Sequence, residues 1–260
     1  MLLALDIGNT NIKIGVFSGD EDSSPHTPAA TWRLNTESGR TLDEYGLLIT
    51  NLLPLRGIEP ALITDVALCS AVPPLRSVFR DMSNTYFGIE PLVVGTGVKT
   101  GIKILYDNPR DVGADRIVDA VAALNLYGGP VIVVDFGTGT VFDAITADGE
   151  YLGGAIAPGV SVAAEALYRS ASQLRRVELE RPQTAIGTNT IHALQSGLVL
   201  GYTDIVKGMV GRFNQELGGG SKVVATGGFA ELIAAEPAIF DAVNQDLTLS
   251  GLKIIYEMNQ

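Results

Sequence analysis

The sequence predicts an α/β fold with an internally duplicated architecture, and three observations lead to this prediction. Apolar segments of strand length alternate with amphipathic helical segments over the first hundred residues, which is the pattern of helices that cover a sheet. A motif of strand, Asp-x-Gly, polar turn and second strand occurs twice, in residues 2–19 and 131–149. Apolar residues make up 46% of the 260 residues, enough for one large core or two smaller ones.

The two copies of this motif align residue by residue around their aspartates. Asp6 in the first copy matches Asp135 in the second, and the apolar runs before them predict buried strands. The turns at 8–11 and 137–140 are rich in glycine and in hydroxyl or amide side chains. Such a turn aims several N–H groups at one point, as phosphate oxygens require, and the nearby carboxylate suits an accompanying cation. Two unrelated buried hairpins are the alternative explanation of this pattern.

Hydrophobic periodicity predicts the other elements. It indicates strands at 31–34, 65–68, 91–94 and 222–225, and helices at 41–55, 75–86, 111–127, 161–170 and 191–213. Residues 153–159 are small and predict a tight loop that permits close backbone approach. Residues 241–259 predict a strand or turn followed by a short helix. An apolar stripe supports the longest helix: Leu194, Leu198, Ile205, Met209 and Phe213.

Charge and composition exclude several classes of protein. A formal net charge of −11 argues against nucleic acid as the main partner, because no broad basic face is available. Cys69 is the single cysteine, so an internal disulfide and a Cys/His metal site are excluded, and a small core residue is expected there. The first apolar run contains Asp6 and has no basic residues before it, unlike a signal peptide. No apolar run reaches the roughly 18 residues of a membrane span, so we expect a cytoplasmic protein without a membrane partner.

Three further charged residues are candidates for chemistry. Lys13 lies on the return strand of the first hairpin, from which its ammonium group can reach a phosphate; an ordinary exposed lysine is the alternative. Asp115 lies in the first turn of the helix at 111–127, where it can accept a proton from a substrate hydroxyl or simply complement the helix dipole. Arg116, beside it, is suited to gripping a carboxylate or a phosphate.

Five motifs together resemble the acetate and sugar kinase, Hsp70 and actin superfamily and, within it, the type III pantothenate kinase family. The motifs are Asp6-x-Gly8-Asn9-Thr10, Gly113-Ala114-Asp115-Arg116, Asp135-x-Gly137-Thr138-x-Thr140, Gly187-x-Asn189-Thr190 and Thr226-Gly227-Gly228. They occur in the order of the family and cover the chain from its start to near its end. Each motif alone carries moderate weight, whereas the ordered set is specific.

The resemblance implies two ribonuclease-H-like, actin-like ATPase domains, residues 1–115 and 116–260, with ATP in a cleft between them. It implies transfer of the γ-phosphate of ATP to the primary hydroxyl of pantothenate, which gives 4'-phosphopantothenate, the first step of coenzyme A biosynthesis. It also implies Mg²⁺ and a monovalent cation such as K⁺ or NH₄⁺. A homodimer is implied as well, in which the partner subunit helps to form the substrate pocket, and the helix at 191–213 is its expected surface.

The resemblance also assigns roles to individual positions. Asp115 is the base for the pantothenate hydroxyl, Asp135 binds the monovalent cation, and Asp6 holds Mg²⁺ directly or through water. The implied ATP-binding residues are Asp6, Ile7, Gly8, Asn9, Thr10, Asn11, Ile12, Lys13, Gly137, Thr138, Thr226, Gly227 and Gly228. The implied substrate-binding residues are Tyr106, Gly113, Ala114, Asp115, Arg116 and Thr190.

Two departures from the family pattern and two alternative functions accompany this reading. Val141 stands where the family carries a hydroxyl residue, and Arg175 stands where a proline is usual; neither removes a proposed chemical group. A kinase of the same superfamily that acts on a sugar or an acid is one alternative, because the phosphate loops do not fix the substrate. A non-catalytic nucleotide-binding regulator is the other, although a protein that only binds nucleotide needs no base.

Overall fold

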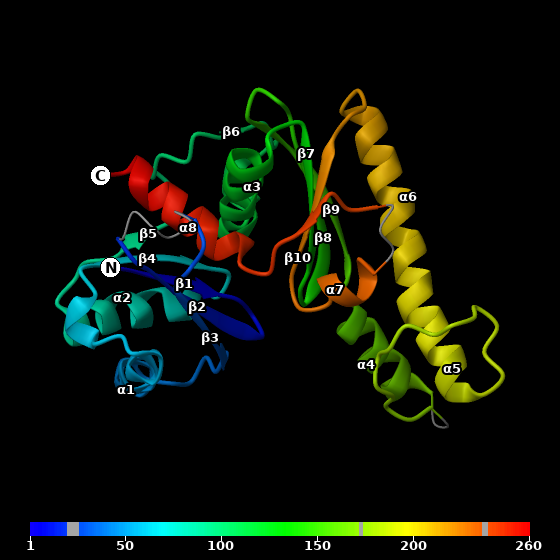
Figure 1. Cartoon of the computed structure of the whole chain (residues 1–260), viewed down its shortest axis with the longest axis horizontal. Coiled ribbons are helices and arrows are strands. Elements are labelled where there is room, and N and C mark those ends of the chain that lie inside the picture. The colour runs from blue at the N-terminus through cyan, green and yellow to red at the C-terminus, as the bar shows by residue number, and fades with distance from the viewer. Residues whose placement is uncertain (20–25, 172–173, 236–238) are drawn as a thin grey trace. The chain divides into compact units, whose positions relative to one another are not determined.

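The computed structural model describes residues 1–19, 26–171, 174–235 and 239–260. The chain divides into two compact α/β units (Figure 1). The first unit consists of Met1–Ile102, Asp107–Ala122 and Asp246–Gln260, and the second of Lys103–Tyr106 and Ala123–Gln245. The predicted α/β class with two sheets is therefore confirmed. The domain boundary after residue 115 falls within a helix, α3 (Ala114–Tyr127), and stays a prediction.

A five-stranded sheet in the order β3-β2-β1-β4-β5 forms the centre of the first unit. Its strands are β1 (Leu2–Ile7), β2 (Asn11–Phe17), β3 (Ala30–Asn35), β4 (Asp65–Ser70) and β5 (Leu92–Val93). β2 is antiparallel to β1 and to β3, whereas β4 runs parallel to β1, and β5 runs parallel to β4. All six residues of β1 are buried, which makes this strand the middle of the unit.

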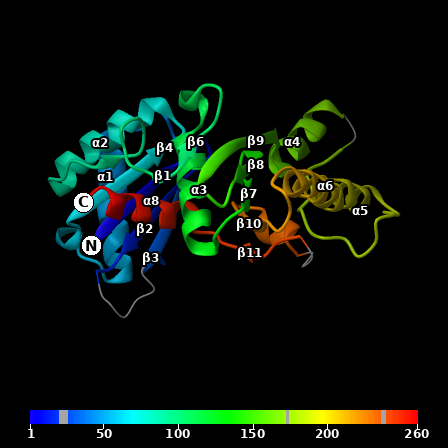
Figure 2. The same cartoon turned by 90° about the horizontal axis from the view of Figure 1, so that it is seen from above.

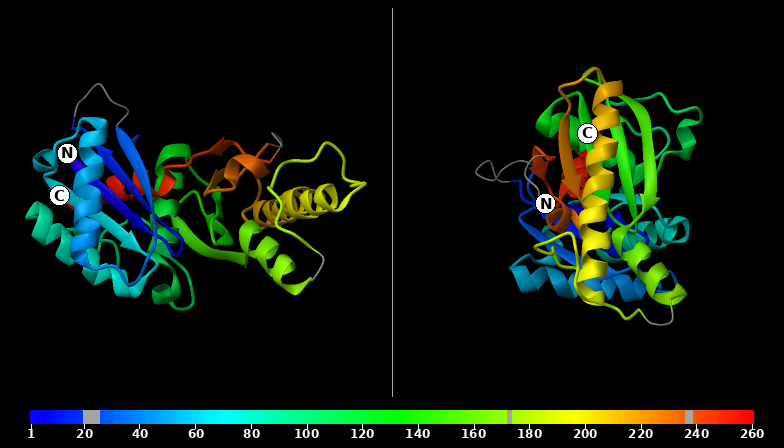
Figure 3. Two further views of the ribbon diagram at one scale, coloured as in Figure 1. Left: turned by 90° about the horizontal axis from the view of Figure 1, so that it is seen from below. Right: turned by 90° about the vertical axis from the view of Figure 1, so that its right-hand side faces the viewer.

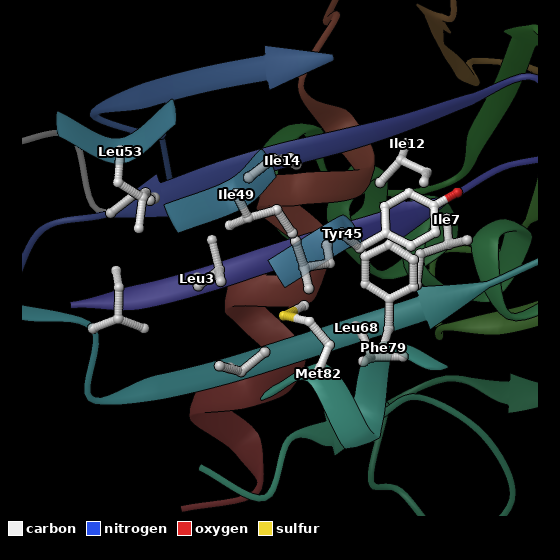
Figure 4. Packing of buried hydrophobic residues seen from close by; sticks show 14 of the residues in the cluster. Leu3, Ile7, Ile12, Ile14, Tyr45, Ile49, Leu53, Leu68, Phe79 and Met82 are labelled. Carbon is white, nitrogen blue, oxygen red and sulfur yellow. The ribbon is translucent and has the colours of Figure 1, made fainter. Parts of the chain in front are cut away.

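Helices cover both faces of this sheet. α1 (Leu42–Leu52) and α2 (Pro73–Phe87) pack on one face, where the rings of Tyr45 and Phe79 lie 4.6 Å apart between centroids beside Ile7 and Ile12 (Figure 4). α8 (Leu247–Met258) lies along β1, β2 and β4 (Figure 2). A Cβ at Gly15 of β2 would meet Leu249 Cδ1 at 2.9 Å, so α8 covers the opposite face. The sequence predicted a helix within residues 241–259, but it did not predict that this helix, α8, belongs to the first unit.

The second unit repeats the strand order of the first. Its sheet has the order β11-β10-β7-β8-β9-β6. The strands are β6 (Lys103–Ile104), β7 (Val131–Phe136), β8 (Gly139–Ile145), β9 (Glu150–Pro158), β10 (Lys222–Thr226) and β11 (Ala242–Val243). β7, β8 and β9 form an antiparallel meander, and β10 and β11 continue in parallel beyond β7. β1 to β5 show the same arrangement, so the predicted duplication is confirmed at the level of topology; β6 is an addition at the edge of β9.

The predicted loop at 153–159 is wrong, because β9 continues to Pro158 and pairs with β8 along its length. The glycines that suggested a loop lie inside the strand. Gly153 has a φ of +125° beside an irregularity in the β8–β9 register, which is a use of glycine typical of bulges.

The helices that lie wholly within the described part of the second unit are α4 (Val160–Ser170), α5 (Thr190–Gln195), α6 (Gly201–Glu216) and α7 (Ala230–Ile233). A π-helical segment, Ser196–Leu200, joins α5 and α6 into one long helix (Figure 3). The predicted stripe holds for Leu194 and Leu198, which are buried, and for Met209 and Phe213, which are half-buried against the core, but Ile205 is 47% exposed and Val206 is buried instead. No helix in the part of the chain that the structure describes is long and apolar enough to span a membrane.

Candidate active site

The predicted first phosphate loop connects β1 and β2 and is held by the residue that follows β3. The N–H of Gly8 donates to the carbonyl of Asn11 at 3.0 Å and closes the turn. Thr36 donates from Oγ1 to the carbonyl of Gly8 at 2.7 Å and from its N–H to the carbonyl of Thr10 at 3.0 Å. These hydrogen bonds from Thr36 hold the backbone of the turn in place. Asn9 and Thr10 are exposed at its tip.

Two of the predicted ATP-binding residues have their side chains in the core. Ile7 and Ile12 are fully buried in the cluster that α1 and α2 cover (Figure 4). They fix the two strand ends from which the loop projects, so any contact of theirs with a nucleotide is restricted to the backbone.

Asp6 lies near the end of β1 and is 9% exposed. Burial raises the pKa of its carboxyl from the usual 3.8 to about 6; the Lys13 ammonium acts in the opposite direction, and the Asp115 carboxylate adds to the rise. Lys13 is the cross-strand partner of Asp6 in the β1–β2 ladder. The structure therefore brings three predicted residues of the first unit together: Asp6, Lys13 and Asp115.

The sequence did not indicate that Cys69 contacts Asp6. The two residues are partners in the parallel β1–β4 ladder, and the buried Cys69 Sγ donates to Asp6 Oδ1 at 3.6 Å. Burial, together with the carboxylates of Asp6, Asp115 and Asp119, raises the pKa of the thiol well above its usual range. The thiol therefore stays protonated and remains a donor. Cys69 lies at the carboxyl end of the strand next to β1, and ligands bind at the carboxyl ends of the strands in α/β sheets. This position was the signal in the sequence that could have indicated a place for Cys69 near the site.

Asp115 lies in the first turn of α3. Its Oδ1 accepts a hydrogen bond from the N–H of Arg116 at 3.0 Å. A Cβ at Gly113 would lie 2.4 Å from the same Oδ1, so the glycine makes room for this carboxylate. The negative charge of Asp115 raises the pKa values of both Asp6 and Cys69.

The predicted second phosphate loop, Gly137-Thr138, connects β7 and β8. Asp135 is the fifth of six residues in its strand, as Asp6 is in β1. Its cross-strand partner is Val141, whereas Asp6 faces Lys13. The second hairpin therefore carries a neutral side chain at the position where the first carries a lysine.

Residues 226–228 follow β10 and lie against the second hairpin. Thr226 is the ladder partner of Asp135 and is 1% exposed, and its Oγ1 has no hydrogen-bond partner among the described residues. Gly227 has a φ of +91°, and a Cβ there would lie 2.3 Å from Asp135 Oδ1 and 2.6 Å from the backbone N of Phe136. The hydroxyl of Thr226 and the carboxylate of Asp135 share one face of the sheet, since ladder partners point the same way.

This pair of oxygen donors fits a hard cation. Carboxylate and neutral oxygens are what such ions prefer, and the buried Thr226 hydroxyl would gain the partner that a buried polar group needs. The described residues contain no cluster of three or more His, Cys, Asp or Glu side chains that could hold a metal. A divalent ion held by Asp6 or Asp135 would take one or two carboxylates, with phosphate and water as its other ligands.

Two predicted substrate residues belong to the second unit and lie on different elements. Tyr106 follows β6 and is half-buried. Thr190 is exposed and opens α5, whose N-cap, Asn189, accepts from the N–H of His192 at 2.9 Å. Of the two departures from the family pattern, Val141 is half-buried at the second loop. Arg175 is exposed in the segment after α4.

Replacing Gly227 with Ala is expected to lower the free energy of unfolding by about 1–3 kcal/mol, because an alanine at this φ is strained and its Cβ collides with Asp135 and Phe136. Thermal unfolding of the ligand-free protein measures this loss. Gly228→Ala is the matched control, since a Cβ there meets nothing within 4 Å, and it should unfold like the wild type. Equal unfolding of both variants would contradict the packing of this loop on the second hairpin.

Comparisons with known proteins show the family of this chain. Residues 2–212 match the family model described as type III pantothenate kinase. The chain is 54% identical over 260 residues to the type III pantothenate kinase of Roseiflexus sp. (strain RS-1), with 100% of both chains covered. It is 51% identical over 259 residues to the type III pantothenate kinase of Myxococcus xanthus (strain DK1622), with 100% of this chain and 99% of the relative covered.

Solved structures share the fold at low identity. A Campylobacter jejuni protein described as a Baf family transcriptional activator superposes with a TM-score of 0.62 at 20% identity, over 99% of this chain and 98% of that chain. An inorganic polyphosphate/ATP-glucomannokinase from Arthrobacter sp. strain KM superposes with a TM-score of 0.53 at 15% identity, over 100% and 99%. The predicted actin-like ATPase and sugar kinase fold class is confirmed. With the family model matching most of its length and relatives above 50% identity spanning all of it, this chain belongs to the type III pantothenate kinase family.

Proposed function

We propose that the chain transfers the γ-phosphoryl group of ATP to the primary hydroxyl of pantothenate and so forms 4'-phosphopantothenate, the first step of coenzyme A biosynthesis. One observation carries the proposal: Asp115 lies near the Asp6–Lys13 pair in a chain 54% identical to a type III pantothenate kinase. In phosphoryl transfer the protein mainly aligns the reacting groups and neutralises the charge on the phosphates. A carboxylate base and a lysine beside a phosphate loop supply both.

In the first unit, Asp115 would accept the proton of the pantothenate hydroxyl as its oxygen attacks the γ-phosphorus. The ammonium group of Lys13 would neutralise charge on the transferred phosphate, and the N–H groups of the first loop would hold the phosphate oxygens. Asp6, ionised above pH 6, would orient Mg²⁺ directly or through water. Bound Mg²⁺ supplies further charge neutralisation on the β- and γ-phosphates.

In the second unit, Thr138 and Gly137 would contact the phosphates of ATP, and the glycines 227–228 would approach the adenosine. Asp135, with the Thr226 hydroxyl, would hold K⁺ or NH₄⁺. The positive charge of this cation would neutralise phosphate charge, as Lys13 would in the first hairpin. Pantothenate carries a carboxylate, for which Arg116 is a suitable partner. Gly113, Ala114, Tyr106 and Thr190 are the other proposed contacts of pantothenate.

A coupled assay of ADP release tests the proposal and separates it from its alternatives. Purified protein with ATP and Mg²⁺ should release ADP only when pantothenate is added, and faster in K⁺ than in Na⁺ buffer. Release that depends on glucose or acetate instead would favour another kinase of the superfamily. Tight ATP binding without release under any of these conditions would favour a nucleotide-binding regulator.

We also propose a homodimer whose partner subunit completes the pantothenate pocket. Ile191 and Ile205 support this proposal, because both are exposed, at 54% and 47%, on the long helix that contains α5 and α6. Exposed apolar side chains that recur along one helix are typical of an interface.

Light scattering should give a particle of twice the 27.4 kDa chain mass, and Ile205→Asp should shift it toward the monomer. Leu55→Asp is the matched control, since Leu55 is 75% exposed in the first unit and is not part of the proposed surface. A wild type that is monomeric at micromolar concentration would contradict both the dimer and the shared pocket.

A further inference from the structure

We infer that Gly153, Tyr151 and Asp143 are positioning residues that hold the ring of Tyr106 where it meets the substrate. The inference rests on the proposed function, in which Tyr106 contacts pantothenate. None of the three is needed by the phosphate loops or by the base. All four residues belong to the second unit, so their contacts lie within one compact body.

The backbone that leads to Tyr106 is attached to β9. β6 pairs with β9 in parallel, with Ile104 opposite Tyr151. Beyond β6, the N–H of Leu105 donates to the carbonyl of Tyr151 at 2.9 Å. At the start of the pairing, Lys103 Nζ lies 2.8 Å from Glu150 Oε1. The residue immediately before Tyr106 is therefore fixed by the same strand that carries Tyr151 and Gly153.

Gly153 provides the surface on which the Tyr106 ring lies. A Cβ at Gly153 would lie 3.2 Å from Tyr106 Cε2 and 3.3 Å from Cδ2, tighter than ordinary contact. The φ of Gly153 is +125°, a conformation that side chains rarely allow. The bulge thus presents bare backbone to the ring, and any side chain at this position would displace Tyr106.

The second contact of the Tyr106 ring is with Tyr151, whose own side chain is held in place by a hydrogen bond to Asp143. The ring centroids of Tyr106 and Tyr151 are 6.5 Å apart at an interplanar angle of 51°, within the range of favourable aromatic pairs. The Tyr151 hydroxyl donates to Asp143 Oδ1 at 2.5 Å, and the two residues are 0% and 2% exposed. This is the length of a charge-assisted hydrogen bond. A buried carboxylate is costly to leave without its donor, so the bond fixes the rotamer of Tyr151 and the position of its ring.

The expected signature is a change in substrate binding with little change in chemistry. Tyr151→Phe removes only the hydroxyl and should raise the KM for pantothenate about three- to tenfold, the worth of one hydrogen bond. Its kcat and its KM for ATP should stay near the wild-type values. Gly153→Ala should raise the KM for pantothenate further, because it displaces Tyr106 directly. Asp143→Asn keeps an acceptor for the hydroxyl and should lie between the wild type and Tyr151→Phe.

Tyr256→Phe is the matched control. Burial and the neighbouring Asp65 carboxylate raise the pKa of Tyr256, so this variant also removes a tyrosine hydroxyl beside an aspartate, but at the start of β4 in the first unit. A second readout is independent of the reaction: the ¹⁹F NMR signal of Tyr106 in protein labelled with 3-fluorotyrosine, identified by its loss in Tyr106→Phe. This signal should move or broaden in Tyr151→Phe and Gly153→Ala and stay in place in Tyr256→Phe.

The two readouts separate the possible failures. An unmoved Tyr106 signal in Tyr151→Phe would overturn the positioning of Tyr106. A moved signal with an unchanged KM for pantothenate, in an enzyme that turns pantothenate over, would overturn the role of this ring in binding. A wild type without pantothenate-dependent ADP release would overturn the proposed function and with it the substrate role of Tyr106. The Tyr106 signal reports on the positioning in either case.

Discussion

Replacing Asp115 with Asn is expected to lower the rate of phosphoryl transfer by about 10²–10⁴, the range for loss of a general base. The amide has the size of the carboxylate and keeps an oxygen for the N–H of Arg116, but it cannot take the proton of the pantothenate hydroxyl. ATP binding should survive, because the phosphate loops are untouched. Steady-state ADP release and calorimetric titration with ATP measure the two effects.

The same variant distinguishes a base from a residue that only complements the helix dipole. Loss of the dipole interaction alone would lower the free energy of unfolding by about 0.3–1 kcal/mol and leave turnover intact. Asp111→Asn is the control, because Asp111 is exposed and accepts from Asn108 Nδ2 at 2.8 Å outside the proposed chemistry. Turnover of Asp115→Asn equal to that of the control would remove Asp115 from its role.

Replacing Asp6 with Asn is expected to stabilise the ligand-free protein while it impairs catalysis. The pKa of Asp6 is about 6 in the folded chain against a usual 3.8, so the folded state binds the proton more tightly and loses stability as the pH rises between these values. About two pKa units correspond to at most about 3 kcal/mol at neutral pH. Asn carries no charge and avoids this cost. Loss of a carboxylate that orients a metal should lower activity about 10- to 100-fold.

The pH dependence is the test of this explanation. At pH 7.5, urea unfolding should show the Asp6→Asn variant to be more stable than the wild type, and at pH 4, where wild-type Asp6 is protonated, the difference should largely vanish. Asp81→Asn is a suitable control, since Asp81 is exposed on α2. A variant that is less stable than the wild type at pH 7.5 would show that the attraction of Lys13 outweighs the burial of the charge.

The duplicated hairpins were predictable because their signal is local. Four apolar residues, an aspartate and a glycine turn specify both β1–β2 and β7–β8, and the two aspartates occupy the same place in their strands. What the alignment did not give is the shorter second loop, which puts Val141 opposite Asp135 where Lys13 lies opposite Asp6.

The misplaced features depend on tertiary structure or on irregular backbone. α8 belongs to the first unit, although residues 123–245 of the second unit separate it in sequence from the rest of the first unit. No local sequence pattern encodes this return of the chain to the first unit. Ile205 is exposed while its neighbour Val206 is buried, a difference that helical spacing alone does not resolve, and β9 contains two of the glycines that suggested a loop, Gly153 and Gly154. Cys69 contacts Asp6 only through the parallel pairing of β4 with β1, a register that single-strand patterns do not specify.

The most direct measurement follows the γ-phosphate itself, in protein supplied with γ-labelled ATP, Mg²⁺, K⁺ and pantothenate. The label is expected in 4'-phosphopantothenate, one equivalent for each ADP formed, with Asp115→Asn slowed by the factor given above. Label released as inorganic phosphate, or tight ATP binding with no transfer to pantothenate in any buffer, would contradict a pantothenate kinase and favour another function for the two phosphate loops.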